Sequence, residues 1–159
     1  MSAYLLVQRD DSSADFFDAA GRGQLQMKRG PSGTVLPPHA RIDPDSTTPQ
    51  LHPMVVSGQG TIVSWSVVHQ APHPALSDAV PYISALVELA EGPWLIVRLV
   101  GPTAPLHSGA RVRARFARTG TEAQWGEVVP VFELVASPAQ RSELLSPSNV
   151  ADAARLEHG

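Results

Sequence analysis

The stretch of sequence that decides the fold is residues 58–69, which read GQGTIVSWSVVH. From Thr61 to His69 apolar and polar side chains alternate, as they do along a β-strand whose successive residues point to opposite faces. Gly58 and Gly60 stand ahead of this run and can adopt positive φ values, which suit a tight turn or a bulge. The stretch therefore predicts a long β-strand that begins just after a turn.

Strand patterns continue after this stretch to residue 135. Short apolar runs bounded by turn residues cover residues 82–89, 94–100, 111–118 and 128–135, while residues 70–80 read as a loop. Short strands with a turn signal about every ten residues are typical of an all-β barrel or sandwich. About five to six strands in roughly 80 residues predict a small Greek-key barrel of the OB type.

The sequence ahead of the barrel predicts an irregular arm over residues 1–12, a helix over 13–20 and a short strand over 24–28. Ser12 or Ser13 is expected to cap the helix by accepting the backbone N–H groups of its first turn. The helix should have one apolar face and end at two glycines, which are contributed by Phe16, Phe17, Ala20, Gly21 and Gly23.

Two segments lack a clear strand pattern. Residues 29–53 contain six prolines and few core residues, chiefly Val35, Leu36, Ile42 and Leu51. About 25 residues without clear elements are unusual inside a compact domain, so the segment should be a mobile loop or a small module held by something else. Residues 137–159 carry short helical patterns and predict a helical or flexible tail.

Composition narrows the function. The chain has 159 residues and a net charge of −3. It has no cysteine, and this absence excludes disulfides, thiolate nucleophiles and thiolate metal sites. An acidic balance disfavours nucleic-acid binding, because that affinity comes largely from neutralised phosphates. No apolar run approaches the roughly 18 residues of a membrane span, and the first ten residues do not read as a secretory signal. We expect a cytoplasmic protein that contacts neither nucleic acid nor membrane.

Two histidines and three arginines are the candidate functional side chains. His69 and His73 are four residues apart, a spacing that suits zinc on a helix, but the neighbouring prolines favour a rigid loop whose imidazoles bond to backbone or meet a partner. Arg111, Arg113 and Arg115 share one strand face, where carboxylates of this chain, an acidic partner or ligand phosphates could neutralise them. A solvated face is the interpretation we favour for the arginines.

No other residues form a recognisable catalytic set. The sequence has no nucleophile elbow and no phosphate-binding glycine loop. The acidic pairs Asp10-Asp11 and Asp43/Asp45 read as solvated loop charges. The large aromatic residues read as core or interface anchors rather than base-stacking platforms; they are Trp65, Trp94, Trp125, Phe116 and Phe132.

Residues 15–25, which read DFFDAAGRGQL, together with residues 58–69, 81–93 and 129–132, resemble the family of zinc-ribbon plus OB-fold acyl-CoA-associated proteins. The resemblance covers about residues 13–135 and implies a mainly β chain of four parts. These are an arm, helix and first strand (1–28), a degenerate rubredoxin-like zinc-ribbon segment (29–53), an OB-fold domain (54–136) and the tail (137–159).

The family's ribbon usually holds zinc between two Cys-x-x-Cys knuckles. The matching positions here are residues 30–33 and 42–45, where Gly30, Gly33, Ile42 and Asp45 stand in place of cysteine. One carboxylate does not make a structural zinc site, so the resemblance implies a ribbon without zinc. Apolar residues, with Ile42 among them, and a partner surface are then expected to replace the folding energy of the metal.

The resemblance implies a non-catalytic accessory subunit that binds a thiolase-superfamily dimer in a hetero-oligomer and helps to form its acyl-CoA site. Family partners include lipid-transfer-protein-like aldolases of steroid side-chain breakdown, thiolases, acyltransferases and hotdog-fold enoyl-CoA hydratases. The chain would bind no cofactor directly, and His69, His73, Arg111, Arg113 and Arg115 are the candidate contacts with the partner or acyl-CoA. The alternatives are a stand-alone OB-fold protein that binds acyl-CoA or single-stranded nucleic acid, and a hydrolase or lyase that uses the two histidines.

Overall fold

The computed structural model describes residues 4–101 and 105–136. The predicted tail of residues 137–159 lies outside the described residues. The elements in chain order are α1 (Ala14–Gly21), β1 (Leu25–Arg29), β2 (Val35–Leu36), β3 (His52–Val56), β4 (Gln59–Val68), the 3-10 helix η1 (Pro74–Leu76), β5 (Tyr82–Leu89), β6 (Trp94–Leu99), β7 (Arg111–Thr121) and β8 (Gln124–Leu134).

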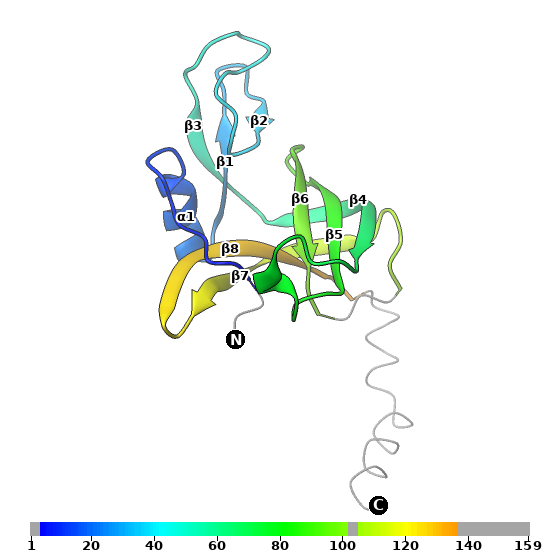
Figure 1. The fold of residues 1–159 in the computed structure, drawn as a ribbon. Helices are drawn as coiled ribbons and strands as arrows, with labels where there is room; N and C mark the ends of the chain where they lie inside the picture. Colours follow the sequence, from blue (N-terminus) through cyan, green and yellow to red (C-terminus); the bar gives the residue numbers. More distant parts are fainter. Residues whose placement is uncertain (1–3, 102–104, 137–159) are drawn as a thin grey trace, which may run out of the picture.

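Five strands close into a barrel in the order β4-β5-β6-β8-β7 (Figure 1). All neighbouring pairs are antiparallel except β6 and β8, which are parallel and meet at the single pair Leu99 and Phe132. This arrangement confirms the predicted mainly β fold with an N-terminal helix and an OB-type barrel. The hairpin of β7 and β8 is longer than the sequence predicts, because both strands continue to its turn at residues 122–123.

The barrel core comes from inward-facing residues of all five strands. Ile62, Val87, Val97, Val112 and Phe132 are buried together, one from each strand. A bulge shifts the register of β4 between residues 62 and 64 and breaks the alternation predicted for the whole of this strand. Residues 64–67 beyond the bulge are exposed.

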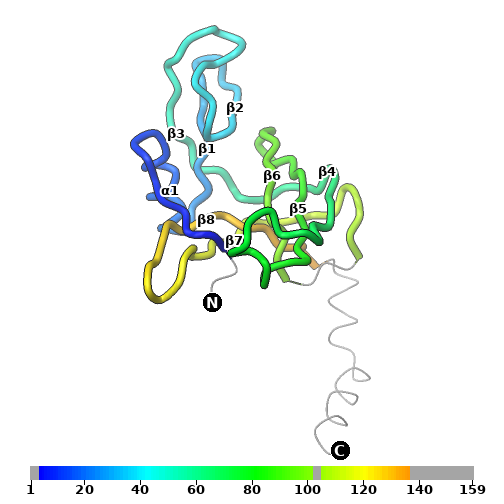
Figure 2. Tube along the Cα trace, in the orientation of Figure 1, coloured from blue at the N-terminus to red at the C-terminus, as the bar shows by residue number. Residues whose placement is uncertain are grey.

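A separate three-stranded antiparallel sheet in the order β2-β1-β3 rises from the barrel, with α1 packed against β8 and β1 (Figure 1). The prediction that residues 29–53 lack clear elements is wrong, because β2, the start of β3 and a bridge between Asp43 and Thr48 lie there. Their pairing partners are distant in sequence, so no local pattern reveals them. The chain passes from β3 through Ser57 and Gly58 into the barrel (Figure 2).

The helix begins without the predicted serine cap. Ser13 occupies the N-cap position, but its side chain makes no capping bond and instead donates to Asp10 Oδ1 over 2.7 Å. The predicted stop is correct, since Gly23 has φ +74° and its N–H donates to the Ala20 carbonyl over 2.9 Å.

The arm ahead of the helix is irregular, as predicted, but it is fastened to the barrel. The Val7 N–H donates to Thr119 Oγ1 over 3.1 Å, and the Val7 carbonyl accepts from the Glu127 N–H over 2.8 Å. Arg9 forms ion pairs with Glu127 at 2.7 Å and with Asp18 of α1 at 2.6 Å. Hydrogen bonding from Arg9 lowers the pKa of Glu127. The arm therefore links the end of the β7–β8 hairpin to α1.

Candidate interaction surface

The strand β6 has an open edge. One side of β6 pairs with β5 from Trp94 to Leu99. On the other side, among the described residues, the ladder with β8 is limited to the pair formed by Leu99 and Phe132, followed by a bond of 2.8 Å from the Val100 N–H to the Phe132 carbonyl. Residues 94–97 in the described part of the chain therefore pair with no strand on this side, although β8 lies close to the end of β6. Such an edge is a template for an added strand.

Two large apolar side chains of β6 are exposed beside this edge. Ile96 is 81% exposed and Trp94 is 52% exposed, and Leu86 of β5 lies directly opposite Ile96. The Trp94 indole Nε1 donates to Glu88 Oε2 over 2.7 Å, which fixes the orientation of its ring. A single exposed apolar residue needs no explanation, but two such residues on an unpaired strand edge indicate an interaction surface.

The β5–β6 turn is tied to the linker between the small sheet and the barrel. Glu91 in this turn accepts from the Ser57 N–H over 2.9 Å and from the Ser57 hydroxyl over 3.3 Å. Because Ser57 joins β3 to β4, these bonds hold the tip of the β5–β6 hairpin next to the base of the small sheet. The open edge is therefore presented in a fixed relation to that sheet.

The three candidate arginines share the outer face of β7, as predicted. Arg113 Nε lies 2.6 Å from Glu133 Oε1, and Arg115 NH1 lies 2.9 Å from Glu133 Oε2. Hydrogen bonds from Arg115 and then Arg113 lower the pKa of Glu133, while that pairing raises the pKa of Arg115. Of the three neutralising groups considered, a carboxylate of this chain is thus present. Arg111 forms no ion pair within the described residues.

The two candidate histidines lie away from the arginines. His69 follows the end of β4 and is exposed, and His73 precedes η1, where its Nδ1 accepts from the Ala75 N–H over 3.1 Å. Arg111 pairs with Thr61 near the opposite end of β4. The structure therefore gives His73 the backbone bond considered above and does not bring the two candidate sets together. In residues 4–101 and 105–136, no group of three or more histidine or acidic side chains could hold a metal ion.

The tryptophans are not core residues. Trp65, Trp94 and Trp125 are all between 40% and 52% exposed, so only the interface part of the earlier interpretation remains open for them. Phe132 is fully buried and Phe116 packs against the core, as predicted. The Arg118 guanidinium stacks over the Trp125 ring with its central carbon 5.5 Å from the ring centroid.

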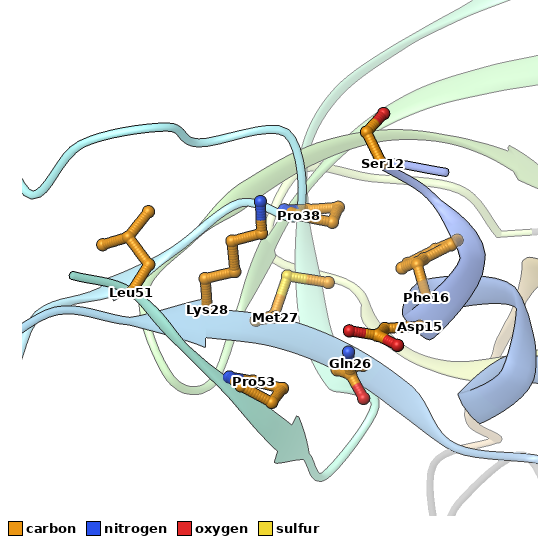
Figure 3. Close-up of a pocket in the computed structure, with 9 residues that line it drawn as sticks. All are labelled: Ser12, Asp15, Phe16, Gln26, Met27, Lys28, Pro38, Leu51 and Pro53. Carbon is orange, nitrogen blue, oxygen red and sulfur yellow. The ribbon is translucent and has the colours of Figure 1, made fainter. Parts of the chain in front are cut away.

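A small pocket lies between α1 and the small sheet (Figure 3). Its volume is about 120 Å³, below the roughly 300 Å³ at which pockets for small molecules begin. Its walls include Phe16, Met27, Leu51 and Pro53, and the nearby Lys28 Nζ donates to the Ala40 carbonyl over 2.8 Å. This pocket cannot enclose an acyl-CoA molecule.

Sequence reasoning misjudged two residues of the ribbon segment. Ile42, one of the residues predicted to hold this segment together, is 55% exposed and so buries little surface there. Asp43, which was interpreted as a solvated charge, is fully buried. The signal for Asp43 in the sequence, an aspartate two residues before another polar residue, predicts a turn but not burial.

No helix among the described residues has the length and apolar character that crossing a bilayer requires.

Comparison with known proteins points to one group. Residues 54–117 match the family model of the C-terminal OB-fold domain of ChsH2. The chain is 34% identical over 103 residues to a probable enoyl-CoA hydratase alpha subunit of Thermomonospora curvata, across 60% of this chain and 29% of that protein. It is 35% identical over 115 residues to the 3-oxo-4,17-pregnadiene-20-carboxyl-CoA hydratase alpha subunit of Mycobacterium tuberculosis, across 69% of this chain and 36% of that protein.

The chain thus spans about a third of the length of these curated relatives. A solved structure, the Ltp2-ChsH2(DUF35) aldolase, contains a chain that superposes with a TM-score of 0.67 at 28% identity. The match covers 80% of this chain and 98% of that one.

Proposed function

The chain belongs to the OB-fold, acyl-CoA-associated family that contains the C-terminal domain of ChsH2, and on this basis we propose that it is a non-catalytic accessory subunit of a thiolase-superfamily enzyme. The partner class proposed is a dimeric, lipid-transfer-protein-like aldolase. The subunit would stabilise this partner and help to form its acyl-CoA site, acting in the cytoplasm without nucleic acid or membrane.

The observation that carries this proposal is the open β6 edge with Trp94 and Ile96. An unpaired edge with exposed apolar side chains promotes aggregation when it stays bare, whereas an obligate partner would cover it. The chain of the Ltp2-ChsH2(DUF35) aldolase that superposes on this one is matched over 98% of its length, which supports an aldolase as that partner. The separation of the candidate histidines from the candidate arginines supports a binding role rather than catalysis by this chain alone.

The proposed substrate is a steroid side chain carried as a CoA thioester. The pregnadiene-carboxyl-CoA in the name of the Mycobacterium tuberculosis relative supports this proposal. The chain would bind no cofactor itself, and the acyl-CoA would lie in the partner's site. Arg111 is the residue that we propose meets a CoA phosphate from that site, because Arg113 and Arg115 are already paired with Glu133.

A hotdog-fold hydratase is the second proposed partner. Both curated relatives are named as hydratase alpha subunits, and each is about three times as long as the matched region. A hydratase could bind the same chain at a surface other than the β6 edge. The two partners would then act on successive CoA thioesters of one side chain.

Co-expression with a thiolase-like aldolase of the proposed class tests the proposal. Size-exclusion chromatography with static light scattering should show a stable hetero-oligomer, and aldol cleavage of a steroid CoA thioester should require both proteins. A chain that elutes apart from the thiolase-like protein but together with a hydratase would favour the second partner. A chain that elutes as a free monomer in the presence of either protein would refute the accessory role.

A further inference from the structure

The two knuckle loops of the small sheet are joined by a buried carboxylate. Asp43 has no exposed surface. Its Oδ2 accepts from the Ser32 N–H over 2.9 Å, in the first loop, and its Oδ1 accepts from the Asp45 N–H over 3.0 Å, in the second. Both carboxylate oxygens of Asp43 are therefore engaged by backbone N–H groups, one from each loop. One side chain therefore connects residues 30–33 with residues 42–46.

Backbone geometry around Asp43 is adapted to this contact. A Cβ atom added to Gly30 would overlap the Asp43 carboxylate, with Oδ2 only 2.2 Å away. The Asp43 N–H donates to the Thr48 carbonyl over 2.8 Å, and the Asp43 carbonyl accepts from the Thr47 N–H over 2.7 Å. Glycine at position 30 thus lets the first loop approach the carboxylate closely, while the second loop holds the Asp43 backbone in place.

These loops do not fit the zinc that the ribbon resemblance implies. Structural zinc is held by thiolates and imidazoles, and residues 30–33 and 42–45 contain neither. The oxygens of Asp43 accept from backbone N–H groups, whose hydrogens would point at a cation placed between the loops. Asp45 Oδ2 accepts from the Thr34 hydroxyl over 2.8 Å. The donor set is that of an anion cradle rather than of a metal site.

We propose that the Asp43 carboxylate replaces the metal ion of a zinc ribbon and makes the small sheet fold without metal. Charge-assisted hydrogen bonds are about twice as strong as neutral ones, and the two backbone bonds lower the cost of burying this charge. Hydrogen bonding from Ser32, the largest cause, holds the pKa of Asp43 well below its usual range, so the carboxylate stays ionised at neutral pH. Asp43 is a positioning residue, and this inference holds whether or not the proposed function is correct.

Amide hydrogen exchange of the full-length chain, followed by NMR, tests whether the Asp43 carboxylate joins the two loops. In Asp43→Ala the Ser32 and Asp45 amides should exchange about tenfold faster or more, because both lose their acceptor. The isosteric Asp43→Asn retains one acceptor oxygen, so only one of the two amides should lose protection. Asp45→Asn, which alters a neighbouring exposed carboxylate, is the matched control and should leave the Ser32 amide protected.

Barrel amides such as Val87 report whether each variant is folded, and they should keep their protection in all three. Metal analysis and thermal unfolding with EDTA or added zinc complete the test, and neither addition should change Tm. Unchanged Ser32 exchange in Asp43→Ala would overturn the proposal. Stoichiometric zinc, with loss of sheet protection in EDTA, would also overturn it.

Discussion

The substitution Ile96→Thr tests the β6 edge with little effect on the fold. Threonine keeps the β-branched shape that strands favour, while two of the four side-chain carbons are removed and a hydroxyl is added. At about 0.8 kcal/mol for each buried methylene, and with 81% of Ile96 exposed before docking, the lost burial is about 1.3 kcal/mol. Desolvating the new hydroxyl adds to this, so Kd for the partner should rise by about 10- to 30-fold.

The measurement is a titration of the purified thiolase-like partner with wild-type and variant chains by calorimetry. Urea unfolding of each free chain is measured in parallel. Because Ile96 lies on the surface of the free chain, the substitution should change the unfolding free energy of the chain by no more than about 0.5 kcal/mol. A loss of affinity without loss of stability places the effect at the interface.

Trp125→Ala provides the control for surface apolarity. Trp125 is exposed to a similar extent as Trp94 but lies at the tip of the β7–β8 hairpin, away from β6. Its replacement should change Kd for the partner by less than about twofold, because a residue outside the interface contributes little to the affinity. An Ile96→Thr chain that binds like wild type, beside a Trp125→Ala chain that binds weakly, would refute the β6 edge as the docking surface.

Three further predictions concern the fold. Gly30→Ala should lower Tm and expose the ribbon amides, since the new Cβ collides with Asp43, whereas Gly21→Ala, with no atom within 4 Å of its added Cβ, should be neutral or slightly stabilising by thermal unfolding. Glu133→Gln should be less stable than wild type at neutral pH. Because the pKa of Glu133 is lowered in the folded chain, this difference in unfolding free energy should vanish as the pH falls through that lowered pKa. Urea unfolding at several pH values measures it, and a difference that does not change with pH would contradict the prediction. Phe132→Ala should cost about 3–5 kcal/mol of unfolding free energy, as expected for a fully buried aromatic ring, and a loss below about 1.5 kcal/mol would show that the core is not continuous there.

Local patterns predicted the barrel well because each strand carries its own alternation. The predicted strand over residues 82–89 coincides with β5, and the start of β7 at Arg111 is also correct. The end of β7 and the start of β8 lie outside the predicted strands, and Thr119 at that end of β7 is held by the arm through Val7. Length errors thus arise where a strand is supported by contacts remote in sequence.

The candidate site was harder to predict, because its features arise from pairing between distant segments. The open edge of β6 exists because β8 joins it only at Leu99, and nothing within residues 94–99 shows where β8 will lie. The burial of Asp43 likewise depends on Ser32 and Gly30, more than ten residues earlier. By contrast, the face shared by the arginines follows from strand periodicity alone, and its neutralisation by an internal carboxylate was among the options considered.

The proposed role of Asp43 would explain how a ribbon-like sheet keeps its shape without a metal ion. A zinc ribbon is rigid because its ion fixes the two loops, and a partner surface needs such rigidity to avoid an entropic cost on binding. Here Asp43 fixes the loops, Glu91 fixes the base of the sheet through Ser57, and Arg9 fixes α1 to the β7–β8 hairpin. The bonds of Glu91 to Ser57 set the base of the small sheet against the barrel, while those of Asp43 order its loops. Rigidity that hydrogen bonds supply in this way does not depend on the availability of zinc, so the proposed subunit would need no metal to reach the form that docks.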